Sequence, residues 1–295
     1  METIAFVQQF ASPALDRFFI LVSDLGSSGV YIVLLLFAYL VLDPRLGQRL
    51  GAAVLFGFYL NFHLKGLVGT QRPFILDPEL GRTPEAAPTS GPGFPSAHAQ
   101  MSLTFWGYAA WWLKQPWFWA LAVLVVLLIS LSRVYLGMHF LVDIVGGLGI
   151  GLLYTAVFAF AEPLWAGFRG RSRRLRVTLG VVVPLLLLVF LPPPGLEADL
   201  LMGGMAAFLS APFILPYKPS PALWRRLAVF ALGVVLVFGV LIGSSALLPE
   251  VLKRTPVVGF VRYLLLGYTG LLLTPWLAQR LRLAPPRPAA RKTRA

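Results

Sequence analysis

The chain has 295 residues, of which 58% are hydrophobic and 13% are charged, and its mean hydropathy is +0.78. Apolar runs of membrane-spanning length recur along it, which excludes an ordinary soluble domain and indicates a polytopic membrane protein. The net charge of +13 does not indicate a nucleic-acid partner, because basic cytoplasmic loops account for it, and the lack of cysteine excludes disulfides and thiolate metal sites.

The first predicted element covers residues 3–22, where apolar and polar residues alternate as in an amphipathic helix at the membrane interface. The apolar runs that follow predict about nine transmembrane helices, so the expected fold class is an all-α, polytopic membrane helix bundle. Residues 74–95, rich in proline, glycine and acidic groups, predict a loop outside the hydrocarbon. In chain order, the spans are expected near 27–42, 50–67, 97–113, 117–133, 139–161, 177–192, 199–216, 226–248 and 258–279.

A basic break after the fifth span divides the chain. The predicted domains are a core at 1–165 with the interfacial helix and five spans, a basic cytoplasmic linker at 166–176, four further spans at 177–281 and a basic cytoplasmic tail at 282–295. The polar residues with a chemical character all precede this break, and no internal repeat is evident.

The distribution of basic residues predicts the orientation. The positive-inside rule assigns the loops that hold most of them to the cytoplasm, which places the C-terminus inside and the polar stretch described below outside. An active site on the extracytoplasmic face of a bacterial inner membrane is therefore expected. The cytoplasmic set comprises Arg45, Arg49, Lys114, the arginines of 169–176, Lys218, Arg225, Arg226 and the basic residues after Gln279.

One polar stretch lies between two strongly apolar runs: Ser132–Asp143 reads S-R-V-Y-L-G-M-H-F-L-V-D. Charged groups in such a setting are costly and are functional candidates by default. If the residues after Met138 are helical, His139 and Asp143 lie on one face. The carboxylate would then hold one imidazole nitrogen and leave the other free to react.

Two further segments reach the same side of the membrane. Lys65 precedes Arg72-Pro73 by two helical turns, so both cations could lie at one end of a span. Ser96 is a good N-cap, and the helix that begins at Ala97-His98 offers free backbone N–H groups to an anion. Three cations, a helix N-terminus and two histidines together suit a phosphoryl group.

Other polar or glycine-rich positions are assigned structural roles. His63 matches no part of this pattern and is expected to be structural. Gly147 and Gly151 lie in mid-span, so they are expected to allow close helix packing and do not form a nucleotide loop.

The pattern K-x6-R-P, P-S-x-H and S-R-x5-H-x3-D resembles the three-part signature of the type-2 phosphatidic acid phosphatase superfamily. Its members include lipid phosphate phosphatases, undecaprenyl-diphosphate phosphatases, sphingosine-phosphate phosphatases, glucose-6-phosphatase and vanadium haloperoxidases. The resemblance covers about residues 20–165. One position departs from the family pattern, because Ala97 stands where the pattern has glycine. This alanine would add backbone strain only if a positive φ is required there.

The resemblance implies roles for the matching residues. His139 would attack phosphorus to form a phosphohistidine, Asp143 would orient it, and His98 would be the general acid. Lys65, Arg72 and Arg133 would bind the phosphoryl oxygens, assisted by Ser96 and the amides of Ala97 and His98. No metal or other cofactor is expected.

The expected function is therefore metal-independent hydrolysis of a lipid phosphate or diphosphate. Undecaprenyl diphosphate and phosphatidic-type phosphates lead the substrate candidates, with sphingoid phosphates and soluble esters after them. A lipid phosphotransferase, and a flippase or transporter that uses the cations as a head-group site, remain alternatives. The expected partners are the lipid substrate and membrane lipids, with no nucleic acid, and a homo-oligomer is left open.

Overall fold

The computed structural model describes residues 1–82, 91–192, 198–253 and 255–286, and every regular element in these ranges is helical. This confirms the all-α expectation. Three of the elements, η1, η4 and η5, are π-helical turns inside longer helices, and η2 is a 3-10 turn. The elements are α1 (Glu2–Gln8), α2 (Pro13–Asp24), α3 (Ser28–Phe37), η1 (Ala38–Leu42), α4 (Pro44–Val68), α5 (Pro73–Leu76), η2 (Pro78–Leu80), α6 (Ala97–Ser102), η4 (Leu103–Gly107), α7 (Tyr108–Leu113), α8 (Pro116–Tyr135), α9 (Leu141–Phe160), α10 (Glu162–Gly170), α11 (Arg173–Phe190), α12 (Ala198–Ile214), α13 (Leu223–Leu247), α14 (Glu250–Lys253), α15 (Pro256–Tyr268), η5 (Thr269–Leu273) and α16 (Thr274–Arg280).

Within the described ranges, five helices are long and apolar enough to cross a membrane, and a sixth span results if α2 and α3–η1, bent by 53°, count as one. Each of the nine expected segments lies on a helix, but several are short. The helix Ala97–Leu113 rises about 25 Å, less than the roughly 30 Å of a bilayer core. Helix α11 carries Arg173, Arg174 and Arg176 in its first turn, which shortens its apolar part. The count of nine stays a prediction.

The expected single helix over 3–22 is wrong, because the chain forms two helices there, α1 and α2. Ser12 caps α2 by accepting a hydrogen bond from the Leu15 amide at 3.3 Å, and Pro13 occupies the first helical position. Proline disfavours a helical conformation in the residue before it, so the first helix has to end before Ser12. The loop expected at 74–95 also contains the short elements α5 and η2, while residues 83–90 lie outside the described residues.

The glycines of α9 permit the close helix packing expected of them. A Cβ atom on Gly147 would lie 2.6 Å from the Ser96 carbonyl oxygen, and one on Gly151 would lie 2.9 Å from the Gln100 carbonyl oxygen. Helix α9 therefore packs directly against the backbone of α6, which brings the ends of these two helices together.

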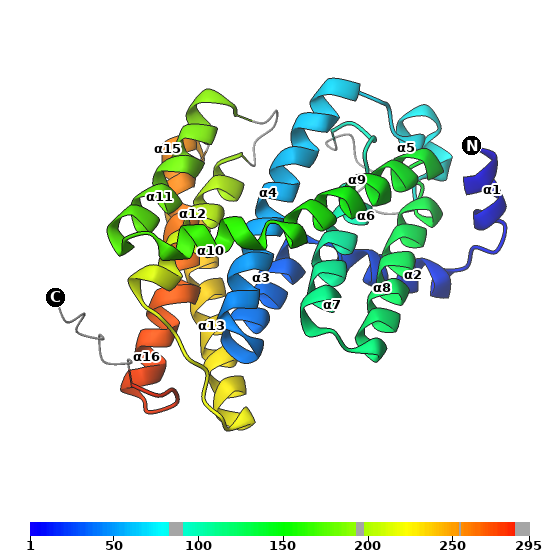
Figure 1. Ribbon diagram of the computed structural model, residues 1–295. Coiled ribbons are helices and arrows are strands. Elements are labelled where there is room, and N and C mark those ends of the chain that lie inside the picture. Colours follow the sequence, from blue (N-terminus) through cyan, green and yellow to red (C-terminus); the bar gives the residue numbers. More distant parts are fainter. Residues whose placement is uncertain (83–90, 193–197, 254, 287–295) are drawn as a thin grey trace.

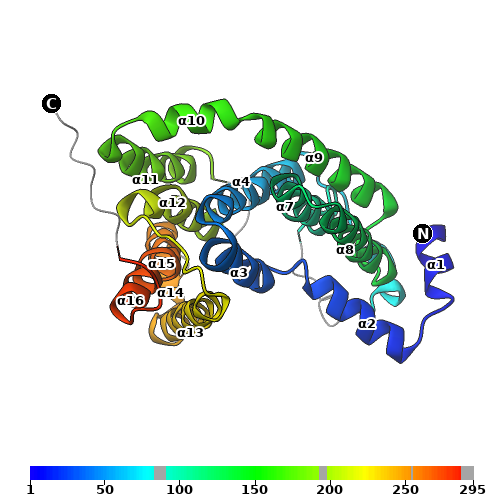
Figure 2. The ribbon, with the colours of Figure 1, turned by 60° about the horizontal axis from the view of Figure 1, so that its bottom comes forward.

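The two halves of the chain lie on either side of α3 and α4. Figures 1 and 2 show α6 to α9 together with α2 on one side, and α11 to α16 on the other. In the C-terminal half, α12 packs against α11, α15 and α4. The expected tail 282–295 lies mostly outside the described residues.

Candidate active site

The loop Leu136–Phe140 connects α8 to α9 and carries His139. Its turn depends on Gly137, which has φ +70 and whose added Cβ would lie 1.9 Å from the Leu80 carbonyl oxygen. Helix α9 begins only at Leu141, so the conditional expectation of a helical His139 is not met. The imidazole still reaches the carboxylate, because Asp143 lies in the first turn of α9, with its Oδ2 atom 3.3 Å from His139 Nδ1.

The two nitrogens of His139 have different neighbours. Asp143 Oδ2 also accepts a hydrogen bond from the Phe140 amide at 2.9 Å, which fixes the carboxylate. His139 Nε2 lies 3.3 Å from an Arg72 guanidinium nitrogen, Nη1. Because a guanidinium can only donate, Nε2 has to be the acceptor and Nδ1 then carries the proton toward Asp143. This tautomer presents a lone pair on Nε2 toward the cations.

Burial and nearby cations keep His139 neutral. The side chain is 2% exposed. Burial lowers the pKa of His139 well below its usual value, and the charges of Arg72, Arg133 and Lys65 lower it further. A neutral imidazole is the form that can act as a nucleophile.

Lys65 and Arg72 lie at the end of α4 and just after it, and both are buried. Lys65 Nζ donates to the carbonyl oxygens of Pro92 (2.6 Å) and Gly93 (3.0 Å). Arg72 Nε donates to the Gly91 carbonyl at 2.8 Å, and its Nη1 atom donates to the Met138 carbonyl at 3.2 Å. Hydrogen bonds from these two cations thus hold the segment before α6 and the His139 loop close together.

The helix start at Ser96–His98 joins the same cluster. The Ser96 amide donates to the Asp143 carbonyl oxygen at 3.0 Å. Ser96 is the N-cap of α6 and its Oγ atom lies 3.5 Å from the Ala99 amide. Ala97 is the first helical residue, and the described non-glycine residues with positive φ are Lys114 and Arg282. Alanine therefore adds no strain where the family pattern has glycine.

The end of α2 and the turn that follows it complete the cluster, which the sequence did not indicate. Ser23 Oγ accepts a hydrogen bond from Arg133 Nη1 at 2.5 Å. A Cβ atom on Gly26 would lie 2.6 Å from His98 Cδ2, so the His98 ring rests against the Gly26 backbone. No motif marks these two residues, and their role depends on contacts across more than seventy residues of chain.

A polar network fastens the N-terminal helices to this site. Asp16 accepts two hydrogen bonds from the Arg82 guanidinium, at 2.8 and 3.0 Å, and one from Tyr135 Oη at 2.7 Å. Gln8 Nε2 donates to the carbonyls of Leu80 and Tyr135. The expected interfacial segment is thereby attached to the end of α8 that precedes the His139 loop. His63 lies outside the cluster, with its ring 4.6 Å from that of Tyr59.

We expect the Gly26→Ala variant to lower kcat by about 10- to 100-fold, because the new methyl group has to displace the His98 ring. If His98 is the proton donor, the loss should shrink with an aryl phosphate, whose leaving group needs no proton. Gly29→Ala is the matched control, since a Cβ there has no atom within 4 Å. Equal losses with alkyl and aryl phosphates would contradict a role in placing the acid.

The arrangement suits chemistry on a phosphoryl group. It combines a neutral, oriented imidazole with three basic side chains, a second imidazole and a helix N-terminus, which can neutralise and position a tetrahedral anion. Across the ranges that the structure describes, no group of three His, Asp or Glu side chains could hold a metal ion.

Comparison with known proteins gives two family matches. Residues 47–166 match the PAP2 superfamily, and residues 196–286 match the "PAP2 superfamily phosphatase, transmembrane extension". The first match contains Lys65, Arg72, His98, His139 and Asp143.

Similar proteins include two curated relatives and one solved structure. Lipid phosphate phosphatase delta of Arabidopsis thaliana is 32% identical over 52% of this chain and 39% of its own length. Sphingosine-1-phosphate phosphatase 2 of Mus musculus is 31% identical over 48% of this chain and 40% of its own length. The chain thus spans about two fifths of these relatives. The crystal structure of Aquifex aeolicus LpxE matches with 26% identity and a TM-score of 0.45, over 54% of this chain and 93% of that chain.

Proposed function

Because the chain carries a PAP2 superfamily domain together with the superfamily's transmembrane extension, we propose that it is an integral membrane phosphatase acting on a lipid phosphate or diphosphate. The observation that carries the proposal is the state of His139. Its Nδ1 atom faces Asp143 and its Nε2 atom faces the Arg72 guanidinium, so a phosphoryl group that takes over the hydrogen bond from Arg72 would meet the Nε2 lone pair.

The reaction would proceed in two steps. With the negatively charged substrate bound, His98 takes up a proton from solvent and becomes the imidazolium. His139 Nε2 then attacks phosphorus, the P–N bond forms as the bond to the lipid oxygen breaks, and His98 donates its proton to that oxygen and becomes neutral. Water then attacks the phosphohistidine, gives its proton to His98 and releases phosphate, which restores both imidazoles. Asp143 balances the positive charge on His139 between the two steps.

The remaining site residues would neutralise the phosphoryl oxygens. Lys65, Arg72 and Arg133 supply positive charge, and the amides at the α6 N-terminus supply backbone donors. Phosphoryl transfer relies chiefly on such positioning and charge stabilisation, so no metal ion is required by this scheme.

The substrate class and the location follow from the membrane setting. Helices long and apolar enough to span a bilayer carry or flank the cluster, which favours a substrate with a hydrocarbon tail over a soluble ester. The distribution of basic loops favours a site on the outer face of a bacterial inner membrane, with the C-terminus in the cytoplasm. The core at 1–165 would carry the chemistry, and the spans at 177–281 would form a second unit.

The test is phosphate release by the purified protein in the presence of EDTA, measured with a panel of lipid monophosphates, lipid diphosphates and glucose 6-phosphate. We expect release from at least one lipid and no loss of rate with the chelator. Labelled phosphate that appears in a second lipid would instead show a phosphotransferase. Lipid binding without release would favour the transporter.

A further inference from the structure

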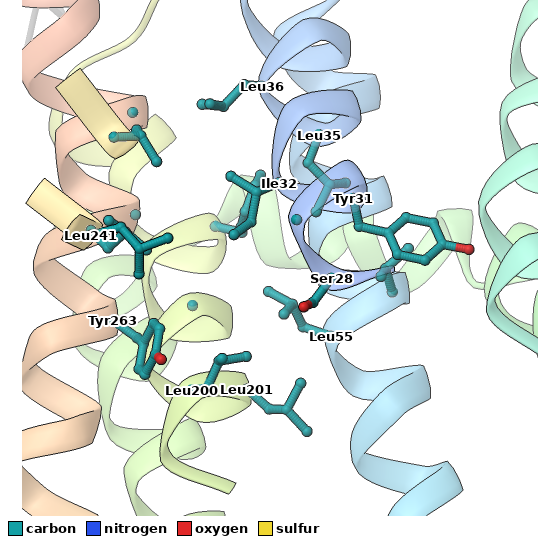
Figure 3. A pocket seen from close by; sticks show the side chains of 18 of the residues that line it. Ser28, Tyr31, Ile32, Leu35, Leu36, Leu55, Leu200, Leu201, Leu241 and Tyr263 are labelled. Carbon is teal, nitrogen blue, oxygen red and sulfur yellow. The ribbon is translucent and has the colours of Figure 1, made fainter. Parts of the chain in front are cut away.

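An apolar cavity of about 270 Å³ lies between the two halves of the chain. Helices α3 and α4 form one wall, and α12, α13 and α15 with η5 form the other. Figure 3 shows Ile32 and Leu35 on the α3 side, facing Leu241 and Tyr263 across the space. The cavity therefore exists only because the C-terminal helices pack beside the core.

The cavity runs along the helices. It is lined from Ser28 to Leu36 on α3 and from Leu200 to Phe208 on α12. Each of these stretches rises about 12 Å along its helix axis. A space of this length along the helices suits an extended chain better than a compact ligand.

The cavity walls offer few hydrogen-bonding groups to a polar ligand. Apart from Ser28 and two tyrosines, the lining consists of aliphatic side chains, phenylalanines and glycines. The Tyr31 hydroxyl points away from the cavity, toward the core helices (Figure 3). A polar or charged group placed there would lose its hydration without gaining hydrogen bonds, whereas a hydrocarbon chain would gain by leaving water.

One end of the cavity, at Ser28, lies near the candidate active site along the chain, although no residue of that site lines the cavity. Ser28 follows Gly26 by two residues, so their Cα atoms lie at most about 7.6 Å apart. Gly26 is the residue against which the His98 ring rests. The end of the cavity at Ser28 is thus two residues along the chain from the contact between Gly26 and His98, the imidazole that would protonate the oxygen joining phosphate to the lipid.

We propose that this cavity holds the hydrocarbon tail of the lipid whose phosphate is bound at His139, and that α12, α13 and α15 supply the outer half of the tail site. The inference rests on the proposed phosphatase function and gives the C-terminal helices a role in it. The substrate is then a lipid phosphate whose chain enters tail-first beside α3, with the phosphate remaining at the polar end.

Selectivity for chain length tests this tail site. We expect the Gly29→Phe and Leu241→Trp variants, which add bulk to lining positions, to lower the ratio of kcat/KM for long-chain over short-chain phosphatidic acid. Loss of contact with about three methylene groups corresponds to a roughly 50-fold drop in this ratio. Gly239→Phe and Ile242→Trp are matched controls, because neither residue lines the cavity, a Cβ on Gly239 has no atom within 4 Å and Ile242 is 66% exposed.

A failure of the tail-site proposal and a failure of the proposed function would give different results. No phosphate release by the unsubstituted protein from either chain length, or from any other lipid phosphate or diphosphate of the panel, would overturn the proposed function. Release from both, with a ratio that the two cavity variants leave unchanged or with equal losses on both lipids, would overturn the tail site alone.

A second measurement uses only the unsubstituted protein, so it does not depend on how variants fold. Phosphatidic acid with a photoreactive group in its tail should label peptides from α3 and α12 in the stretches that line the cavity. Labelling confined to exposed positions such as Val235 and Ile242 would overturn the tail site.

Discussion

Replacement of His139 by alanine is expected to lower phosphate release at least about 10⁴-fold, because the variant lacks the atom that would attack phosphorus. The cations and the α6 N-terminus remain in place, so binding of the lipid head group should be largely retained. The measurement is phosphate release at saturating lipid, together with binding of the same lipid to the variant.

The matched control for this variant is His63→Ala. His63 lies on α4, two residues before Lys65, and its ring packs against Tyr59. It has no place in the proposed mechanism, so its removal should leave kcat close to that of the unsubstituted protein. Full activity in the His139 variant, or equal losses in both variants, would refute His139 as the nucleophile.

Asp143→Asn is expected to lower kcat by about 10³- to 10⁴-fold with a small change in KM. The amide keeps the shape of the side chain but removes the negative charge that would balance the phosphohistidine. In other His–Asp pairs, the same exchange lowers kcat by about 10⁴-fold. We expect a similar loss of kcat here, because Asp143 is 1% exposed and little solvent is available to replace its negative charge.

The measurement for Asp143→Asn is steady-state kinetics with a thermal-unfolding control. Asp143 Oδ2 also accepts the Phe140 amide, and asparagine can supply an oxygen there, so the melting temperature should change little. A loss of stability that accounts for the lost rate, or a rise in KM at constant kcat, would contradict a role in activating His139.

Much of the site was predictable from local sequence. Lys65, Arg72, Ser96, His98, Arg133, His139 and Asp143 stand out because charged or polar groups are rare in so apolar a chain. The structure brings the three segments together through direct hydrogen bonds, such as the one between the Ser96 amide and the Asp143 carbonyl. Their catalytic roles remain predictions until the variants are measured.

The lengths of the helices and the positions of the turns between them were less well predicted than the residues of the site. Apolar composition indicated nine spans, but it does not fix how many residues remain helical across a bilayer, and only five or six helices of the described chain are long enough. The break at Ser12–Pro13 follows from proline geometry, whereas the start of α9 at Leu141 depends on Gly137 fitting closely against Leu80.

Composition and local pattern were enough to predict the membrane class, the all-α fold and the residue types of the site, because hydropathy, spacing and charge are local properties. The contacts by which Ser23 and Gly26 close the site, and the apolar cavity that the C-terminal helices form with α3 and α4, depend on how distant parts of the chain pack. A serine hydroxyl or a glycine without a side chain carries no signal of its partner along the chain. Their contacts with Arg133 and His98 exist only once α2 has packed against α8.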